Sequence, residues 1–391
     1  MNLLEGEGPL YFIPDWDDYV DPGYDFKKDV QQNKGWENSV YAHEIYSQPP
    51  YDGILVSKVV EEKSKIRRQR IRKYGIHKAL RVNPDFPVIG DCGAFGYFKE
   101  KTPPYSTSEI LDYYSSGGFN FGVSIDHLIP SKKFADKEFR YRITLENGKK
   151  FIKAHRKKGL RWIPVGAVQG WNPETYALGV REYVKLGYEL IALGGLVRTS
   201  TREIIAILEE VNKVDLQGAR LHLFGVARNK ILPLLKKSSV FSVDSASALR
   251  RAWMGSKDNY HTLDQDYCAI RVPVPGKRGP MKKFKGKILA RAQELEKKSL
   301  HHLRGYASGG VSLQKTLAVV EDYESLYLGE KKSNIANYEK TLKDRPWEKC
   351  QCKICKNIGI EVVIFRGNNR NRRRGFHNTW VLNQRFKVIR K

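Results

Sequence analysis

The sequence predicts an α/β fold and, within that class, a closed (β/α)8 barrel of the TIM type. Two observations predict it: a unit of apolar run, small polar turn and helix recurs along the chain, and polar residues stand at only one end of each run. Near-continuous apolar runs between helices are typical of parallel strands buried on both faces. Seven such runs are recognisable and an eighth is expected near Tyr306. An open doubly wound sheet would have only about five or six strands.

The elements follow one another in a regular order. The expected helices span 61–74, 108–116, 137–158, 174–186, 201–213, 227–237 and 246–254. The expected strands span 53–58, 87–90, 119–125, 162–168, 189–193, 221–224 and 240–243, and the last six are followed by Asp91, Asp126, Gln169, Gly194, Gly225 and Asp244.

The residues at these strand ends are the candidate site. A barrel gathers the carboxyl ends of its strands on one face, so Asp91, Asp126, Gln169, Gly195 and Asp244 should converge there. For Asp244 taken alone, a cap on the N-terminus of the following helix is the competing interpretation. The four other strand ends favour the site.

The chain carries a large excess of positive charge. Its 391 residues include 69 Lys and Arg against 43 Asp and Glu, a formal net charge of +26. Such an excess indicates a polyanionic partner. A hydrophobic content of 41% is enough for a real core and excludes global disorder. The first residues lack the features of a signal peptide and no apolar run approaches membrane-spanning length, so we expect a cytoplasmic protein without membrane contact.

The barrel is expected to occupy residues 51–310, and other segments flank or interrupt it. Residues 1–50, rich in acids, aromatics and Pro, are expected to form an irregular covering layer, with an acidic ligand-facing lobe as the alternative. Residues 255–300 form a basic insertion whose loop at 271–287 is the best candidate for contact with a nucleic-acid backbone, or else a solvated loop. The basic helix at 61–74 favours phosphate contact over a merely solvated face. Residues 311–391 are expected to be helical and metal-binding.

The metal prediction rests on three clustered cysteines. Cys350, Cys352 and Cys355 lie within six positions, and 21 residues separate Cys355 from His377. A disulfide framework is not expected in a cytosolic protein, so this spacing favours a metal. Three thiolates and one imidazole make a closed tetrahedral shell, the pattern of a structural Zn²⁺ site with no open position for catalysis. A metal-braced loop would present the arginines between the ligands to phosphates: Arg366, Arg370, Arg372, Arg373 and Arg374.

In combination, these pieces resemble the tRNA-guanine transglycosylase superfamily. Asp91-Cys-Gly-Ala-Phe95 is similar to its Asp-Ser-Gly-Gly-Phe motif, and Val243-Asp-Ser-Ala-Ser247 is similar to its nucleophile strand. Val168-Gln-Gly170 and Leu193-Gly-Gly-Leu196 look like its base-cradling turns, and the cysteine cluster looks like its zinc site. The resemblance covers about residues 85–255 and 345–380, and the ordered set of motifs is more specific than any one of them.

This sequence departs from the bacterial queuosine enzymes of that superfamily. The nucleophile turn lacks their Pro-Thr-Arg run, Ala94 stands in place of a motif glycine, and the cysteine spacing is shorter. The stretch from Ile13 to Pro22 looks like the DNA-modifying branch (DpdA type), which exchanges guanine in DNA for a 7-deazaguanine such as 7-cyano-7-deazaguanine. DNA is therefore favoured as the partner, with a tRNA transglycosylase or a non-catalytic nucleic-acid-binding paralogue as the alternatives.

The resemblance implies a role for each matched residue. Asp244 would attack C1′ and hold the sugar covalently, and Asp91 would act as general acid and base in a retaining exchange. The base would be bound by Asp126, Gln169, Gly170 and the turn Gly194-Gly195-Leu196. Zn²⁺ would be held by the cysteine cluster, and the resemblance leaves a homodimer and an ATPase partner open.

Other reactive side chains receive structural interpretations. His127, His155 and His222 lie beside or within apolar segments, so we interpret each as a buried histidine with satisfied hydrogen bonds. Cys92 adjoins Asp91, but nothing in the sequence supplies a base for a thiol nucleophile, so it is expected to line the pocket.

Overall fold

The computed structural model describes residue 4 and residues 8–276, 279–328 and 333–390. The chain divides into two compact units. The first comprises Met1–Trp16, Tyr51–Ala246 and Phe386–Lys391, and the second comprises Asp17–Pro50 and Ser247–Arg385. The boundaries near residues 50 and 310 were expected to separate independently folding parts of the chain. They stay a prediction, because the division into compact units describes contacts and not independent folding.

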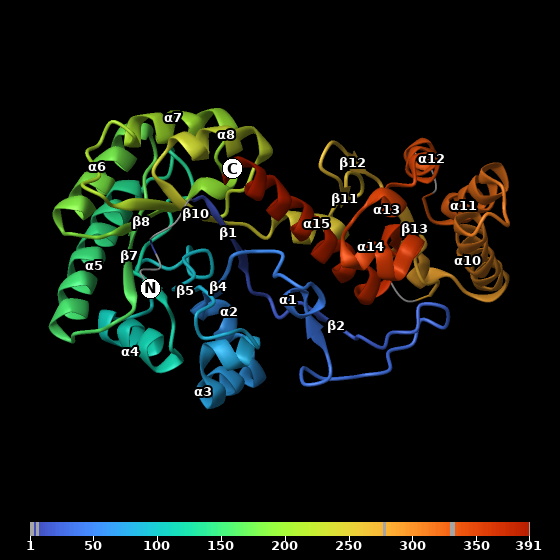
Figure 1. Ribbon diagram of the computed structural model, residues 1–391, viewed down its shortest axis with the longest axis horizontal. Helices are drawn as coiled ribbons and strands as arrows, with labels where there is room; N and C mark the ends of the chain where they lie inside the picture. Colours follow the sequence, from blue (N-terminus) through green and yellow to red (C-terminus); the bar gives the residue numbers. More distant parts are fainter. Residues whose placement is uncertain (1–3, 5–7, 277–278, 329–332, 391) are drawn as a thin grey trace. The chain divides into compact units, whose positions relative to one another are not determined.

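The first unit holds a closed barrel (Figure 1). The order around the ring is β1, β10, β9, β8, β7, β6, β5 and β4, and every neighbouring pair is parallel. This confirms the (β/α)8 barrel predicted from the sequence. The strands are β1 (Leu10–Pro14), β4 (Gly53–Ser57), β5 (Val88–Asp91), β6 (Phe121–Val123), β7 (Ile163–Val168), β8 (Leu190–Leu193), β9 (Arg220–Leu223) and β10 (Val240–Asp244).

Helices connect these strands and begin at residues that suit helix starts. The Ser200 hydroxyl accepts the N–H of Glu203, whose carboxylate accepts the N–H of Ser200, a capping box that starts α7. Asn172 caps α6, which opens with Pro173. The helices of this unit are α2 (Lys58–Glu62), α3 (Lys65–Leu80), α4 (Thr107–Gly117), α5 (Lys137–Lys157), α6 (Pro173–Lys185), α7 (Thr201–Val211) and α8 (Leu232–Lys237).

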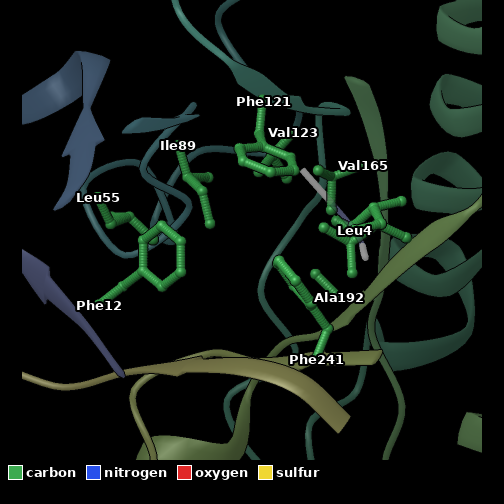
Figure 2. Close-up of a cluster of buried hydrophobic side chains, with 11 residues drawn as sticks. Leu4, Phe12, Leu55, Ile89, Phe121, Val123, Val165, Ala192 and Phe241 are labelled. Carbon is green, nitrogen blue, oxygen red and sulfur yellow. The ribbon is translucent and has the colours of Figure 1, made fainter. Parts of the chain in front are cut away.

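The core of the first unit fills the interior of the barrel. Phe12, Leu55, Ile89, Phe121 and Phe241 come from five different strands and point toward one another inside the ring (Figure 2). Each is nearly inaccessible to solvent. A barrel filled in this way is packed rather than open as a pore, so its chemistry lies at the strand ends.

The position predicted for the eighth strand, near Tyr306, is wrong. Tyr306 lies in the helix α10 (Gly286–Ala307), whereas β1 closes the ring from within the segment expected to be a covering layer. Phe12 of β1 pairs with Asp244 on one side and with Gly53 on the other. The run from Leu10 to Pro14 is short and lies in sequence rich in acids and Pro, so its strand character depends on partners far along the chain.

The second unit is mainly helical. The expected basic insertion at 255–300 forms three short strands and the first part of α10, and residues 277 and 278 of its loop lie outside the described residues. The helix α15 begins in this unit and its last residues, from Phe386, belong to the first. Along the described parts of the chain, every helix is too short or too polar to cross a membrane.

The remaining elements belong to the second unit apart from the end of α15. They are β2 (Tyr19–Val20), β3 (Val40–Tyr41), α1 (Ala42–Ile45), α9 (Ser247–Met254), β11 (Tyr260–His261), β12 (Asp266–Tyr267), β13 (Ile270–Arg271), α11 (Leu313–Leu328), α12 (Ile335–Asp344), α13 (Pro346–Lys349), α14 (Lys353–Ile358), β14 (Ile364–Phe365) and α15 (Gly367–Arg390).

Candidate active site and metal centre

Three carboxylates lie at the carboxyl ends of the barrel strands. Asp91 is the last residue of β5 and Asp244 the last of β10, while Asp126 follows β6 after two residues. Gln169 follows β7 directly, and the turn Gly194-Gly195 follows β8. Asp126 and Asp244 are almost completely buried. One end of a barrel in a strongly basic chain thus concentrates negative charge.

The surroundings of Asp91 favour its protonated form. Its enclosure in the site, together with the nearby carboxylates of Asp126 and Asp244, raises its pKa well above the usual value. The backbone N–H groups of Gly93 and Cys92 face it and oppose this effect only in part. Gly93 has a φ of +87°, and a Cβ there would come within 2.3 Å of the Ser57 hydroxyl, so only glycine suits this turn. Asp91 therefore holds a proton far more readily than an exposed aspartate.

Asp126 and Gln169 form a directly bonded pair. The Gln169 Nε2 donates to Asp126 Oδ2 at 2.5 Å, and the Gln169 Oε1 accepts the N–H of Ile129 at 3.4 Å. The Tyr97 hydroxyl donates to the backbone carbonyl of Asp126 at 2.9 Å and holds the loop after β6. Burial raises the pKa of Asp126 to about 6, and the hydrogen bond from Gln169 limits the rise.

The turn after β8 packs against this pair. A Cβ on Gly194 would lie 2.2 Å from the Gln169 Nε2, and Gly195 has a φ of +75° with the Gln169 Oε1 and the Tyr176 hydroxyl close by. The Tyr176 hydroxyl donates to the Gly194 carbonyl at 2.7 Å. Gly170 packs on the Tyr176 ring instead, because a Cβ there would lie 2.7 Å from that ring. These glycines allow the backbone of the turn to approach the side-chain amide closely.

Asp244 is held by the strand beside it. Its Oδ1 accepts the N–H of Gly225 at 2.9 Å and lies 3.3 Å from the Nε2 of His222. The Nδ1 of His222 in turn lies 2.7 Å from the Ser242 hydroxyl. Both partners of the carboxylate belong to β9 and the turn after it, which argues against the competing interpretation of Asp244 as a cap for α9.

A shallow hollow adjoins the Gly194-Gly195 turn. Phe95 is 50% exposed there although it belongs to the Asp91–Phe95 motif, and Arg198 is also exposed. Sequence analysis identified Phe95 only as part of the Asp91–Phe95 motif, and no sequence pattern identified Arg198. The residues lining the hollow are Phe95, Phe98, Leu128, Ile129, Pro130, Gly195 and Arg198.

The histidines differ in their partners. The Nε2 of His155 bonds to the carbonyl of Trp162 at 2.8 Å, as expected for a structural histidine. The Nε2 of His127 bonds to the carbonyls of Glu100 and Lys101, but its Nδ1 has no hydrogen-bond partner among the described residues, so the expectation of satisfied hydrogen bonds holds for only one of its two ring nitrogens. Both ring nitrogens of His222 have partners, and one of these partners is Asp244.

Cys92 is completely buried beside the Tyr114 hydroxyl at 3.5 Å. Burial and the Asp91 carboxylate raise the pKa of its thiol well above the usual value, which disfavours the thiolate that a nucleophile needs.

In the second unit, Cys350, Cys352, Cys355 and His377 form a cluster that could hold a metal ion. One ligand atom from each residue lies within 4.8 Å of the others. The Nδ1 of His377 lies 3.6 Å from the Cys350 Sγ and 3.4 Å from the Sγ atoms of Cys352 and Cys355. The opposite nitrogen, Nε2, donates to the carbonyl of His261 at 2.7 Å, which leaves Nδ1 as the nitrogen with a free lone pair.

The surroundings of the cluster also suit a bound metal. The Tyr260 ring stacks on His377 with centroids 4.2 Å apart, and its hydroxyl lies 3.2 Å from the Cys355 Sγ. These contacts fix the imidazole and one thiolate in orientation, as outer-shell groups do around metals. The donor set fits a four-coordinate metal.

The arginines between the metal ligands were expected to face phosphates, and this expectation is wrong for all of them except Arg372, whose side chain is 32% exposed and pairs with Asp18. Arg370 and Arg374 are completely buried, and Arg366 and Arg373 are 8% and 7% exposed. Arg370 pairs with Asp29 and Glu361, and Arg366 pairs with Asp29 and Glu296. The guanidinium of Arg374 donates to the carbonyls of Ala252, Val362 and Ile364, that of Arg373 to the carbonyl of Asp21, and that of Arg372 to the carbonyl of Tyr19. These side chains hold the second unit together.

The basic helix expected at 61–74 is also partly structural. The helix α3 begins at Lys65, and Arg67 and Arg70 are buried within it. Arg67 forms an ion pair with Asp15. Lys63, Lys65, Arg72 and Lys73 are exposed and Arg68 is half-buried, and phosphate contact by this segment stays a prediction.

Comparison with known proteins gives one strong relationship. The chain is 38% identical over 402 aligned positions to a DNA-guanine transglycosylase of Salmonella montevideo, and the alignment covers 96% of this chain and 96% of the relative. No protein-family model matches the chain.

Proposed function

The chain belongs to the family of DNA-guanine transglycosylases, and from that premise we propose that it exchanges guanine in DNA for a 7-deazaguanine such as 7-cyano-7-deazaguanine. One observation carries the proposal: Asp91, Asp126 and Asp244 gather at one end of the barrel, although the chain has a net charge of +26. Basic residues outside would hold the phosphates, and the acids inside would do the chemistry.

We assign the two steps of a retaining exchange to two carboxyl groups. Asp244 attacks C1′ of a flipped-out deoxyguanosine, and the C1′–N9 bond breaks with its electron pair passing to the guanine. Asp91 gives its proton to the departing base. The carboxylate of Asp91 then takes the N9 proton of the incoming base, N9 attacks C1′, and Asp244 leaves as a carboxylate. The raised pKa of Asp91 supports this assignment, because a general acid must hold its proton at working pH.

The base would be recognised by hydrogen bonds and stacking. The ionised Asp126 accepts the N–H groups of a guanine-type edge, which adenine does not offer in the same pattern. Gln169, with the backbone of Gly195 and Leu196, would meet the carbonyl side of the base. Phe95 supports a stacking role, because half of its surface is exposed in the hollow beside Gly195.

We propose that the metal of the second unit is a structural Zn²⁺ held by Cys350, Cys352, Cys355 and His377. Three thiolates and an imidazole suit Zn²⁺ better than a hard cation. With all four positions taken by the protein, the ion would brace the fold and would not bind substrate.

The partner polymer is tested directly by labelling. Radiolabelled 7-cyano-7-deazaguanine is incubated with the enzyme and either duplex DNA or tRNA, and the polymer is isolated. We expect label in DNA alone. Label in tRNA alone would overturn the DNA assignment, and label in neither polymer, with guanine release also absent, would favour the non-catalytic binding role. The same assay with and without a candidate ATPase, and sedimentation of the free enzyme, tests the expected partner and the expected homodimer.

A further inference from the structure

We propose that His222 is a positioning residue for Asp244. Its imidazole, held in one tautomer by Ser242, fixes the carboxylate so that Oδ2 is the atom that bonds to C1′. This inference rests on the proposed function, since it concerns how the proposed nucleophile is aimed.

The role proposed for Asp244 assigns the tautomer of His222. An ionised carboxylate can only accept, so the Nε2 of His222, 3.3 Å from Asp244 Oδ1, must carry the hydrogen. Nδ1 is assigned as the acceptor, and the Ser242 hydroxyl, 2.7 Å away, as its donor. The relay therefore runs in one direction, from the serine hydroxyl through the imidazole to the carboxylate.

The position of the ring is fixed by packing. The His222 side chain is 1% exposed and lies edge-on to Phe12 and Phe224, with ring centroids 6.2 and 4.8 Å away. Both neighbours are apolar, so the Ser242 hydroxyl and Asp244 are the polar partners that orient the imidazole.

An irregularity in β10 brings the three residues together. The ladder between β10 and β9 pairs Val240 with Leu221 and then Ser242 with His222, so β10 contains one additional residue between these pairs. Such a bulge changes the direction in which the following side chains point. Here the extra residue sets Ser242 opposite His222, two positions before Asp244.

Both donors to Asp244 act on the same oxygen. The N–H of Gly225 and the Nε2 of His222 point to Oδ1, and within the described residues Oδ2 accepts no hydrogen bond. Oδ2 is thus the atom left for C1′, and Oδ1 becomes the carbonyl oxygen of the ester. When the incoming base displaces Asp244, charge returns to a carboxylate whose Oδ1 these donors stabilise. His222 should therefore act on both formation and resolution of the adduct.

The test compares three variants in a single-turnover assay with guanine-containing duplex DNA. H222L removes the donor, H222Q offers an amide N–H at a similar reach, and S242A removes the hydroxyl that holds the tautomer. We expect H222L to lower the rate of adduct formation about ten- to a hundredfold, the effect of one hydrogen bond to a charged group, with the KM for DNA unchanged. H222Q should recover most of the rate, and S242A should fall between wild type and H222L.

A matched control is H155Q, because His155 is also buried and bonds to a backbone carbonyl away from the site. It should retain the wild-type rate. Equal rate losses in H222L and H222Q, or a wild-type rate in both H222L and S242A, would overturn the inference and leave the exchange activity standing. If H222L does not fold, as judged by its thermal melt, the S242A rate decides alone. A wild-type chain that exchanges no base would overturn the proposed function, and this inference with it.

Discussion

Lowering the pH should weaken the binding of a guanine-type base to the free enzyme. The group responsible is Asp126, whose pKa burial raises to about 6. The base donates N–H groups to the ionised carboxylate, so protonation of Asp126 competes with base binding. The affinity should be constant well above pH 6 and should fall as the pH drops through the pKa.

The magnitude follows from the ionised fraction. At about pH 5, one unit below the pKa, roughly one Asp126 carboxyl in ten is ionised, so the Kd for the base should rise about tenfold, or ~1.4 kcal/mol. Gln169 donates to Asp126 at 2.5 Å and moderates the shift, so its replacement by Met should raise the pKa and move the loss of affinity to higher pH.

Equilibrium binding of 7-cyano-7-deazaguanine, measured by calorimetry from about pH 5 to about pH 8, is the suitable assay. It separates Asp126 from Asp91, whose raised pKa affects rates of proton transfer. The control is D126N, which should bind weakly with little dependence on pH. A wild-type affinity that is flat or improves toward low pH, in protein that remains folded, would refute the reasoning.

Four further predictions concern single sites. D244N should form no covalent adduct on a denaturing gel while still shifting duplex DNA in a native gel, and a persistent adduct would remove Asp244 from its role. C352S, or a strong chelator, should release about one zinc per chain in atomic emission and lower the Tm, whereas full activity without metal would contradict a structural role. F95A should raise the KM for the base about five- to a hundredfold through lost stacking, with F95Y near wild type. G93A should lower stability by about 1–3 kcal/mol in denaturant titration, since its φ of +87° disfavours a side chain; an unchanged midpoint would contradict this.

The parts of the fold that repeat locally could be predicted from the sequence. Seven apolar runs carry their own signal, and the cysteine cluster does too, because its three thiols lie within six positions. The strand β1 could not be found in this way, since Phe12 acquires its role by pairing with Asp244 and Gly53. Its short run offers no period to recognise.

Charge alone could not tell which basic residues face solvent. Arg366 and Arg370 share the partner Asp29, which lies more than three hundred positions earlier in the sequence. Their role in the second unit therefore depends on contacts that composition does not encode. The same holds for His222, whose contact with Asp244 depends on one additional residue in β10. The role of His222 could have been suggested by its position in β9, the strand that pairs with β10, because β10 ends at the candidate nucleophile Asp244.

The pairing of Phe12 with Asp244 has a consequence for biosynthesis. During translation β1 emerges before its neighbours β4 and β10, and the Tyr11 ring also stacks on Phe386, 5.5 Å away, near the end of the described chain. The ring therefore closes at the seam that carries the proposed nucleophile, and it closes late, since contacts between distant residues form slowly. A chain with an open seam would keep Asp244 beside His222 and Gly225, but it would lack the pairing of Phe12 with Asp244 and the hydrogen bond from the N–H of Ser245 to the Phe12 carbonyl. The end of β10 that carries Asp244 is therefore held on both sides only once β1 has joined the barrel.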